Sequence, residues 1–447
     1  MANKLKIFFL LLGDIIVLYI SLFATLIIRY GNGYYEELLD RHLLPFTIVF
    51  IPWILIFYIA GLYDLRRLRN NIDFVKMLAV SIFVSAFVAV SLFYLIPAFG
   101  IAPKTNLFIF FVVFAVLELL WRRFFNAVAS GGEAPNRVFL VGNGAAAEIE
   151  AAINANRQLG YSIEVRMDEA AAHRDPAAFE RAVADGGVNL VVVPNHLKRD
   201  ERLGAALYKL FGRGILVTDL AGFYEAIMRK VPLVDLEEAW FLENIEATAR
   251  FYDPLKRAAE FLFALVVGIV LLPVELLIAL LVKVTSRGPV LIRQERAGRL
   301  GKVFKLYKFR SMVALSPSGM AEVNGAQWAA KDDKRVTPLG KFLRASHLDE
   351  LPQLINIIRG DISFVGPRPE RPEIVAKLKE QIPYYEVRLL VAPGVTGWAQ
   401  INHRADLGLD DVREKLQYDI YYLKNRSVFL DWAIILRTLK SLFVNPK

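Results

Sequence analysis

The sequence predicts a multidomain membrane protein: a four-helix transmembrane bundle, a Rossmann-like α/β domain, and an α+β domain that carries a re-entrant membrane helix. Three observations support this prediction. The N-terminal quarter consists of long apolar runs, residues 136–235 alternate short apolar strands with helical segments, and a further apolar run at 261–282 leads into a strongly basic region. A chain of 447 residues has room for about three domains, and a hydrophobic content of 55% places part of it in lipid.

The first predicted domain, residues 1–125, contains four apolar runs. They cover residues 5–28, 43–63, 74–96 and 107–121. The first three have the roughly 20 residues that a helix needs to cross a bilayer, whereas the fourth would have to recruit flanking residues. The first run is too long for the core of a signal peptide, and no small-residue cleavage site follows it. It is therefore expected to remain as a membrane anchor.

Charged residues around these runs predict the topology. The basic residues are Lys4, Lys6, Arg66, Arg67, Arg69, Arg122 and Arg123. Acids lie in the loop of residues 31–42, so the positive-inside rule places both ends of the bundle in the cytoplasm. Asp14 and Glu118 lie inside the runs, where a charge belongs either to an ion path or to a packing contact. Their places near the run ends favour packing.

Residues 136–235 predict a parallel sheet of Rossmann type. Strands are expected at 137–141, 189–194 and 214–219. The first strand leads into Gly142-Asn143-Gly144 and an Ala-rich helix, a fit to the pattern G-x-G-x-x-A in which a tight turn exposes a helix N-terminus to phosphate.

An acid about 20 residues after this turn would hold a ribose. The candidates are Glu164 and Asp168, but Arg166 lies between them, so neither is clearly placed. Nucleotide binding therefore stays open. A structural, regulatory or oligomerising role is favoured, because a fold alone does not give a function.

The apolar run at 261–282 could cross the membrane on length alone, but its flanks favour a re-entrant helix. Lys256 and Arg257 precede it and Lys283 and Arg287 follow it, so the positive-inside rule keeps both ends in the cytoplasm. Pro273 breaks the middle of the run by removing a backbone donor. We expect a helix at about 256–284 that enters the membrane, bends at Pro273 and returns. The alternative, a fifth crossing, would place the rest of the chain outside.

Residues 286–310 predict a basic β-hairpin with a turn at 298–302. The segment contains eight cations and one acid: Arg287, Arg293, Arg296, Arg299, Lys302, Lys305, Lys308 and Arg310, with Glu295. Cations at this density suit phosphate oxygens or anionic lipid headgroups, in keeping with the net charge of +9. Nucleic acid is not expected, because base-stacking aromatics beside a membrane anchor would be atypical. The absence of cysteine excludes disulfides and thiolate metal sites.

Asp349 and Glu350 form the most informative pair of adjacent acids. They precede Pro352, which a helix tolerates only in its first turn. The residues Leu351, Leu354, Ile355 and Ile358 then follow helical apolar spacing. A rigid helix start is therefore expected to present the pair, with the two carboxylates on either side of a ligand or metal. Taken alone, such a pair is more often formed by ordinary helix-start acids that the helix dipole stabilises.

Three arginines could complete an anion site with this pair. Arg344 lies five residues before Asp349, Arg368 is held between two prolines, and Arg404 ends the turn-rich stretch 394–404. A guanidinium on a rigid mount suits a bidentate contact with phosphate.

Six motifs in this region follow one another in order. They are Thr285-Ser286-Arg287-Gly288-Pro289-Val290, Gln294-Glu295-Arg296-Ala297-Gly298, Lys308-Phe309-Arg310-Ser311-Met312, Leu348-Asp349-Glu350-Leu351-Pro352-Gln353, Gly366-Pro367-Arg368-Pro369 and Pro393-Gly394-Val395-Thr396-Gly397. Together they resemble the bacterial sugar transferases, which are polyprenyl-phosphate sugar-1-phosphate transferases, or monotopic phosphoglycosyl transferases. The resemblance covers about residues 250–447, and the upstream domains are similar in architecture to the long form of the family.

The resemblance implies that residues 250–447 are a catalytic domain. It would transfer a sugar 1-phosphate from a UDP-sugar to undecaprenyl phosphate, releasing UMP and starting an exopolysaccharide, capsule or O-antigen repeat. Asp349 matches the nucleophile that forms a phosphosugar intermediate, and Glu350 matches the second acid of the dyad. Both are expected to place a Mg²⁺ ion, and phosphoryl transfer needs such charge compensation. The expected substrate phosphate-binding residues are Arg344, Arg368, Arg404, Arg310 and Lys308.

The resemblance also sets expectations for partners and location. UDP-sugar, undecaprenyl phosphate and membrane lipids are the expected partners. The oligomeric state stays open, and the Rossmann-like domain is the expected contact surface of a homo-oligomer. The chain is expected in the inner (cytoplasmic) membrane as a multi-pass protein, with the catalytic domain on the cytoplasmic face. It departs from the family at Leu272, where Ser usually precedes the kink proline, and at His403, where Gly is expected.

Two other functions compete with this one. A membrane-bound NAD-dependent nucleotide-sugar dehydratase or epimerase would need Tyr-x-x-x-Lys in the Rossmann-like domain. Tyr161 is instead followed four residues later by Val165, and Tyr208 by Gly212. A non-catalytic membrane scaffold is the other alternative. No motif reports which sugar would be transferred.

Overall fold

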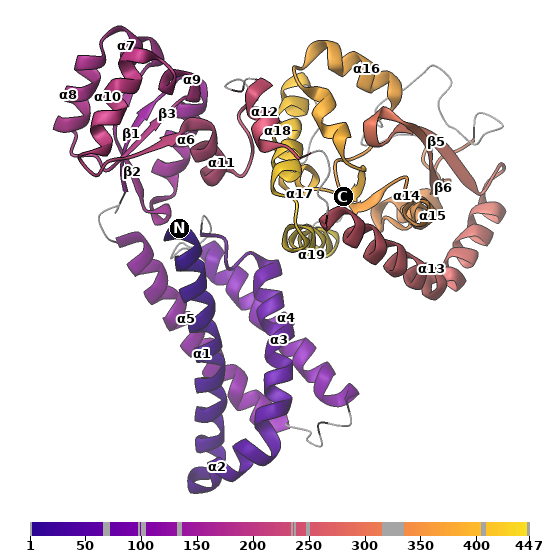
Figure 1. Ribbon diagram of the computed structural model, residues 1–447. Coiled ribbons are helices and arrows are strands. Elements are labelled where there is room, and N and C mark those ends of the chain that lie inside the picture. Colours follow the sequence, from indigo (N-terminus) through magenta and orange to yellow (C-terminus); the bar gives the residue numbers. More distant parts are fainter. Residues whose placement is uncertain are drawn as a thin grey trace. The chain divides into compact units, whose positions relative to one another are not determined.

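The computed structural model describes residues 2–65, 72–96, 99, 104–131, 136–233, 236, 238–246, 251–314, 335–403 and 408–444 (Figure 1). The chain divides into two compact units, Met1–Ile227 and Met228–Lys447. The finer limits predicted for three domains stay a prediction.

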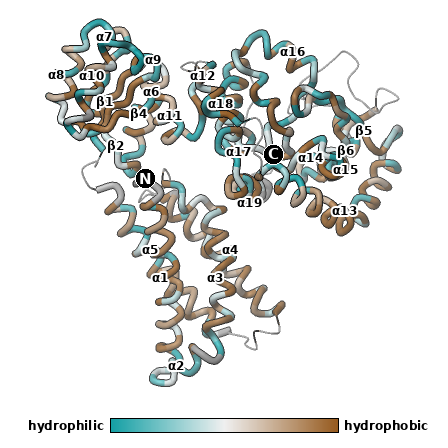
Figure 2. Tube along the Cα trace, viewed as in Figure 1, coloured by the Kyte–Doolittle hydropathy of each residue, from teal (hydrophilic) through white to brown (hydrophobic). Residues whose placement is uncertain are grey.

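Four long helices form the N-terminal part of the first unit: α1 (Ala2–Tyr30), α3 (Leu43–Ala60), α4 (Ile72–Leu95) and α5 (Lys104–Gly131). Short helical pieces join α1 to α3: η1 (Gly31–Gly33), α2 (Tyr34–Glu37) and η2 (Leu38–His42). Hydrophobic residues follow the long helices along their length (Figure 2).

Among the described helices, four segments are long and apolar enough to cross a membrane: Leu5–Glu37, Leu43–Ala60, Phe74–Leu95 and Tyr252–Thr285. They are typical of a membrane protein. The helix α5 is not among the four, and its C-terminal half contains Glu118, Arg122 and Arg123. The crossing predicted at 107–121 therefore stays a prediction, although a long helix is present there.

Asp14 and Glu118 lie in a closed polar cluster around Arg122. The Arg122 guanidinium contacts both carboxylates, with its Nε atom 2.7 Å from Oε1 of Glu118. Asp14 also accepts hydrogen bonds from the Tyr63 hydroxyl at 2.6 Å and from Trp121 Nε1 at 3.0 Å. Because the three charged side chains are buried and paired with one another, the cluster fits the packing role that the sequence favoured.

The α/β part of the first unit is a four-stranded parallel sheet in the order β2-β1-β3-β4. The strands are β1 (Asn136–Val141), β2 (Tyr161–Met167), β3 (Leu190–Val193) and β4 (Leu216–Asp219). The helices are α6 (Gly144–Ala155), α7 (Glu169–Arg174), α8 (Pro176–Asp185), α9 (Asn195–Lys198), α10 (Glu201–Phe211) and α11 (Leu220–Met228). The three strands predicted from the sequence are confirmed. The edge strand β2 was not predicted as a strand.

The ribose-binding candidates in this sheet lie as follows. Glu164 pairs with Arg137 at 3.6 Å. Asp168 immediately follows β2 and precedes α7. Arg166 reaches back to the glycine turn, where its Nη2 atom donates to the carbonyl oxygen of Asn143 at 3.2 Å. The turn after β1 is therefore tied to β2 by a side chain, and nucleotide binding there stays untested.

The second unit mixes helices with two small sheets. Its helices are α12 (Glu238–Asn244), α13 (Tyr252–Thr285), α14 (Pro338–Ala345), α15 (Gln353–Arg359), α16 (Pro372–Gln381), α17 (Trp398–Asn402), α18 (Leu409–Asn425) and α19 (Val428–Val444). Three short helical turns accompany them: η7 (Arg299–Gly301), η8 (Leu348–Glu350) and η9 (Tyr385–Leu390). The strands β5 (Leu291–Ala297) and β6 (Val303–Phe309) form the predicted basic hairpin, and β7 (Ser363–Val365) pairs in parallel with β8 (Gly394–Thr396).

The long helix α13 runs as two limbs that meet at an angle (Figure 1). On the first limb, Arg257 donates to the carbonyl oxygen of Ile357, which in turn packs against Leu306 of β6. On the second limb, the carbonyl oxygen of Val282 accepts a hydrogen bond from Arg310, just past the end of the same strand. A straight helix would hold Arg257 and Val282 about 37 Å apart, too far for both contacts.

The bend fits the shape predicted for a re-entrant helix, and Pro273 lies inside the helix. Large apolar side chains are exposed on both limbs: Phe261, Leu262, Phe263, Val266, Ile269, Val270, Leu272, Val274, Leu276, Leu277, Leu280 and Val284. Exposed apolar surface on this scale indicates contact with lipid. Entry from the cytoplasmic side stays a prediction.

Two glycine-containing loops meet beside β7 and β8. The amide of Gly366 donates to the carbonyl oxygen of Thr396, and the amide of Gly394 to that of Pro367, both at 2.9 Å. A Cβ atom on Gly366 would lie 2.5 Å from the carbonyl oxygen of Ala392. The motifs Gly366-Pro367-Arg368-Pro369 and Pro393-Gly394-Val395-Thr396-Gly397 therefore need glycine where their backbones touch.

Candidate active site

The acid pair lies in the short turn η8, directly before α15. His347 precedes the turn with a left-handed φ of 56°, and Pro352 caps the start of α15. Leu354 and Ile357 of α15 are buried in one cluster with Leu306 of β6, so an apolar face fixes the helix, but Ile355 of the predicted face is 39% exposed and Ile357 is buried instead. The pair is therefore presented from a rigid helix start.

Glu350 is held by two cations. The Nζ atom of Lys308 on β6 lies 2.7 Å from Oε1 of Glu350, and Nη2 of Arg368 lies 3.6 Å from the same oxygen. Burial alone would raise the pKa of Glu350, but the charges of Lys308 and Arg368 outweigh it and lower that pKa to about 2. Glu350 is therefore ionised throughout the physiological range.

Asp349 has the opposite electrostatic setting. Its side chain is buried, with 8% of the residue exposed. Burial raises the pKa of Asp349 to about 6; the charge of Glu350 adds to the increase, and Lys308 and Arg344 oppose it. Two adjacent carboxylates thus differ by several pKa units because their surroundings differ, a pattern common at functional sites.

Asp349 lines a cavity of about 420 Å³ in whose lining basic residues outnumber acids. The basic residues of the lining are Arg296, Lys308, Arg335, Arg344, Arg368, Arg371, Arg388 and Lys415, and the acids are Asp349, Glu370 and Asp419. Two of those acids are neutralised locally, because Lys415 pairs with Glu370 at 3.1 Å and Arg388 with Asp419 at 2.9 Å. The remaining excess of positive charge suits a ligand with several phosphate oxygens.

The same cavity has one apolar wall. Ile374 and Leu378 of α16 line it together with Val412 and Leu416 of α18. A site with a few polar groups and an apolar wall is typical of small-molecule recognition.

Arg368 is positioned through the backbone of its loop. Its carbonyl oxygen accepts a hydrogen bond from Nη2 of Arg388 at 3.0 Å, and the carbonyl oxygen of Pro369 accepts one from Nη1 of Arg296 at 3.1 Å. Arg388 is itself buried between Asp419 and the hydroxyl of Tyr385. The Arg368 side chain remains 44% exposed and reaches Glu350 from this mount.

Asn356 fixes the distance between α15 and β6, the elements that carry Asp349 and Lys308. Its side chain is fully buried, accepts from the amide of Tyr307 at 3.0 Å and donates to the carbonyl oxygen of Lys305 at 2.8 Å. It also donates to Asp361 at 2.9 Å. Neither Asn356 nor Arg388 was predicted from the sequence, although an amide between two isoleucines on an apolar helix face was a visible sign.

The structure gives Arg310 a different position from the other predicted phosphate-binding residues. Its guanidinium donates to the backbone carbonyl oxygens of Val282, Ser286 and Pro289, at the end of α13, and is not among the residues that line the cavity. Gly288 is needed beside it, since a Cβ there would lie 2.5 Å from Arg310 Nη1. The guanidinium thus holds the turn after α13, and carbonyl oxygens take the place expected for phosphate.

The other predicted residues are divided. Lys308, Arg344 and Arg368 meet around Asp349, whereas Arg404 lies outside the described residues. Pro273 lies in α13, away from the cavity lining.

The donor set for a metal consists of the acid pair. Within the part of the chain that the structure describes, no group of three or more His, Asp and Glu side chains could hold a metal ion. Lys308 and Arg368 both contact Oε1 of Glu350, so Oε2 could bind a metal ion without displacing either cation. Mg²⁺ commonly binds through one or two carboxylates together with substrate phosphates. The residues therefore fit a Mg²⁺ ion that shares its ligands with a bound diphosphate.

Comparison with known proteins identifies similar sequences. Residues 251–445 match the family model described as bacterial sugar transferase. The chain is 35% identical over 260 residues to a UDP-N-acetylgalactosamine-undecaprenyl-phosphate N-acetylgalactosaminephosphotransferase of Aeromonas hydrophila, which covers 54% of this chain and 60% of the relative.

Two further relatives match a similar stretch. A UDP-glucose:undecaprenyl-phosphate glucose-1-phosphate transferase of Escherichia coli is 40% identical over 193 residues, 43% of this chain and 40% of the relative. An exopolysaccharide production protein of Rhizobium leguminosarum is 39% identical over 194 residues, 42% of this chain and 94% of the relative. The matched region thus spans about half the length of the first two relatives and nearly all of the third.

Proposed function

Because this chain belongs to the bacterial sugar transferase family, we propose that it transfers a sugar 1-phosphate from a UDP-sugar to undecaprenyl phosphate, releasing UMP and starting a glycan repeat unit. The observation that carries the proposal is the buried Asp349 on the wall of a cationic cavity, beside Lys308 and Arg344. The names of the relatives support undecaprenyl phosphate as the acceptor.

In the first step, an oxygen of the Asp349 carboxylate attacks the phosphorus that bears the sugar. A bond forms between this oxygen and phosphorus, and the bond from phosphorus to the bridging oxygen breaks, so that UMP leaves with the electron pair. The cations around the cavity stabilise charge on the phosphoryl oxygens. A Mg²⁺ ion held by Glu350 and Asp349 would add charge compensation on the diphosphate.

In the second step, an oxygen of undecaprenyl phosphate attacks the same phosphorus and breaks its bond to Asp349. The carboxylate is regenerated, and the sugar is carried on a lipid diphosphate. Glu350 stays ionised beside Lys308 and Arg368, which suits a positioning or metal-holding role better than a proton transfer. A bent membrane helix supports this reading, because it would keep the cavity beside an acceptor confined to the membrane surface.

The test uses the detergent-solubilised full chain, undecaprenyl phosphate and a panel of UDP-sugars. UMP release is expected with at least one sugar, and Asp349→Asn should remove it while leaving UDP binding measurable. EDTA should abolish turnover and Mg²⁺ should restore it. UMP release that survives Asp349→Asn would refute Asp349 as the nucleophile.

A further inference from the structure

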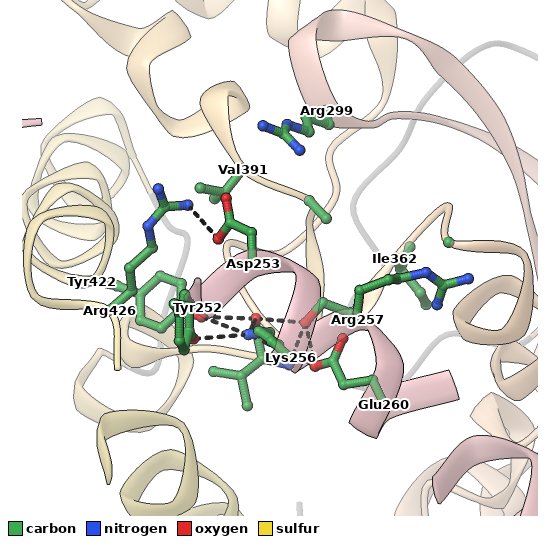
Figure 3. A pocket seen from close by; sticks show the side chains of 14 residues that line it. Tyr252, Asp253, Lys256, Arg257, Glu260, Arg299, Ile362, Val391, Tyr422 and Arg426 are labelled. Atoms are coloured by element: carbon green, nitrogen blue, oxygen red, sulfur yellow. Dashed lines mark hydrogen bonds and ion pairs between the residues drawn. The ribbon is translucent and has the colours of Figure 1, made fainter. Parts of the chain in front are cut away.

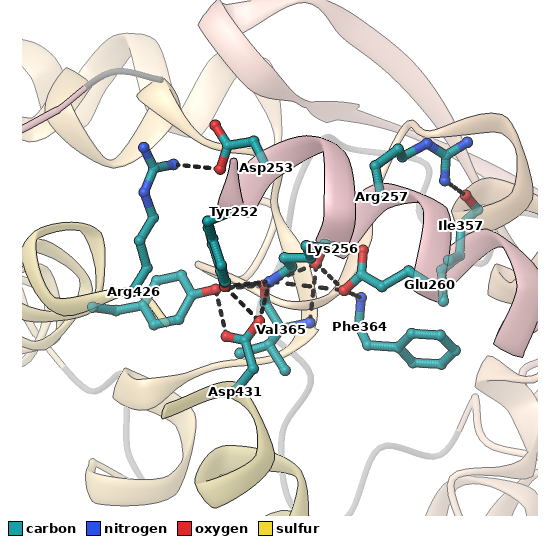
Figure 4. Close-up of polar contacts among 12 residues, drawn as sticks. Tyr252, Asp253, Lys256, Arg257, Glu260, Ile357, Phe364, Val365, Arg426 and Asp431 are labelled. Atoms are coloured by element: carbon teal, nitrogen blue, oxygen red, sulfur yellow. Dashed lines mark hydrogen bonds and ion pairs between the residues drawn. The ribbon is translucent and has the colours of Figure 1, made fainter. Parts of the chain in front are cut away.

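A second polar cluster lies at the start of α13, on side chains that the proposed mechanism does not use (Figure 4). At its centre is the Nζ atom of Lys256, which lies 2.7 Å from Oδ2 of Asp431 on α19, 2.8 Å from the carbonyl oxygen of Val365 on β7, and 2.9 Å from the hydroxyl of Tyr422 on α18. Only 14% of the Lys256 side chain is exposed. One ammonium group therefore joins the root of the membrane helix to three other elements of the unit.

Glu260, one helical turn further along α13, holds the same strand. Its Oε1 atom accepts a hydrogen bond from the Ser363 hydroxyl at 2.6 Å and another from the backbone amide of Phe364 at 3.1 Å. Lys256 and Glu260 together contact every residue of the three-residue strand β7. A strand this short has few ladder hydrogen bonds of its own, so these side chains help to fix its position, together with its pairing with β8 and the Tyr422 hydroxyl, which also donates to the Val365 carbonyl oxygen.

The strand leads directly to the active site. Val365 is followed by Gly366, Pro367 and then Arg368, whose guanidinium reaches Glu350 at 3.6 Å. Close backbone contact at Gly366 and the fixed φ of Pro367 leave little freedom between the strand and the arginine. A displacement of Val365 is therefore passed on to Arg368.

A cavity of about 180 Å³ lies beside the cluster, lined by Lys256, Glu260, Val365 and Tyr422 among others (Figure 3). It provides space into which β7 can move once the Lys256 contact is lost. On the side of this cavity β7 is held by hydrogen bonds, including one from the Tyr422 hydroxyl to the carbonyl oxygen of Val365 at 3.0 Å, while the Val365 side chain is buried in the core.

We propose that Lys256 and Glu260 are positioning residues that hold Arg368 in the active site by fixing β7 to the root of the membrane helix. The inference rests on the proposed function, because Arg368 is taken to bind the donor diphosphate. On this inference, the contacts that hold α13 against the catalytic unit also set the position of Arg368 in the donor site.

The test is a double-mutant cycle on the full chain in detergent, with initial rates measured against UDP-sugar and undecaprenyl phosphate separately. Lys256→Met keeps most of the side-chain volume and removes the ammonium. It should raise the KM for the UDP-sugar and lower kcat, together about 10- to 100-fold in kcat/KM, with the KM for undecaprenyl phosphate unchanged. Lys256→Arg should recover part of the loss, since a guanidinium can still reach Asp431 and Val365.

The second half of the cycle uses Arg368→Ala. If Lys256 acts through Arg368, the double variant should be no slower than Arg368→Ala alone. The matched control is Arg426→Met: Arg426 also binds the first turn of α13, through Asp253 at 3.3 Å, and the carbonyl oxygen of Glu246 at 2.7 Å, without touching β7. It should leave the KM for the UDP-sugar unchanged.

Additive losses in the double variant, or a rise in the acceptor KM alone, would overturn the inference and leave Lys256 as a membrane-seating residue. If Lys256→Met does not fold, Glu260→Gln carries the same test, because it weakens the hold on Ser363 and Phe364 without removing volume. A wild-type protein without UMP release would instead contradict the proposed function. In that case UDP binding to Lys256→Met and to Arg368→Ala is compared by titration calorimetry. Weaker binding in both variants supports the inference, and unchanged binding in Lys256→Met overturns it.

Discussion

The ammonium of Lys308 lies 2.7 Å from Oε1 of Glu350, whereas Asp349, the adjacent acid, is buried on the cavity wall at a raised pKa of about 6. Lys308 and Arg368 lower the pKa of Glu350 to about 2, whereas burial raises the pKa of Asp349, so one of the two neighbouring carboxylates stays ionised and the other titrates near pH 6. The difference has measurable consequences.

Donor turnover should depend on the ionisation of Asp349. Because the carboxylate attacks and the carboxylic acid does not, kcat/KM for the UDP-sugar should fall as pH drops through the Asp349 pKa of about 6. Lys308 opposes the rise in this pKa, so Lys308→Met should shift the acid limb to higher pH in addition to lowering the rate. A pH–rate profile of the two proteins measures both effects. An acid limb that stays in place in Lys308→Met would contradict the assigned coupling.

The two acids should have opposite effects on stability. The folded-state pKa of Asp349 is raised, so stability falls as pH rises from about 4 to about 6, and Asp349→Asn should stabilise the protein at pH 7.5. The folded-state pKa of Glu350 is lowered, so its contribution is present above about pH 4.5 and is lost as pH falls toward 2.

Glu350→Gln should therefore destabilise the protein at pH 7.5, and it would also leave Lys308 without its partner. Thermal unfolding of the two variants should show Tm changes of opposite sign, each on the order of 5 °C. Equal changes of the same sign would mean that the electrostatic settings of the two acids do not differ as described.

A single methyl group should displace the Arg368 loop. Gly366→Ala places a Cβ 2.5 Å from the carbonyl oxygen of Ala392, so the loops that carry Arg368 and Gly394 must separate. We expect a loss of about 1–3 kcal/mol in stability and a raised KM for the UDP-sugar. Gly212→Ala is the control, because its Cβ would meet only an ordinary contact at 3.5 Å. Thermal unfolding and donor kinetics compare the two, and equal behaviour would refute the close approach as the reason for glycine.

The bend in α13 predicts where the C-terminus lies. If the helix enters and leaves on one side, a cysteine placed at Lys447 of this cysteine-free chain should stay protected from an impermeant thiol reagent in intact cells. Lysis should expose it. Labelling of intact cells would show a fifth crossing and refute the re-entrant arrangement.

Much of the fold follows from local sequence patterns. The apolar runs, the basic hairpin and three of the four strands of the parallel sheet are visible in the spacing of apolar residues and in the turn residues between them. The strand β2 is different, because it lies at the sheet edge with Ser162, Glu164 and Arg166 in its middle. It has no continuous apolar run, but Ile163, Val165 and Met167 alternate with these polar residues, and this alternation is a sequence signal for a half-buried strand.

Only part of the candidate site could be predicted from the sequence, because several of its contacts are made to backbone atoms. Prolines mark the acid pair and Arg368 in the sequence, because Pro352 follows the pair after one residue and Arg368 lies between Pro367 and Pro369. Asn356 and Arg388 act through backbone carbonyl oxygens, which have no sequence pattern. Arg310 shows the converse: a guanidinium in a basic motif looks the same whether its acceptors are phosphate or the carbonyl oxygens of Val282 and Ser286.

Both limbs of α13 are fastened to the same core, through Arg257 at one end and Arg310 at the other. A helix held at both ends cannot slide along the membrane normal without taking the whole catalytic unit with it. The cavity would then sit at a set height above the bilayer, decided by the length of the two limbs. A lipid whose phosphate is carried on a longer polar spacer would not place that phosphate at Asp349, even with the same lipid tail. Selection among acceptors would then depend on the height of the phosphate above the bilayer as well as on its chemistry.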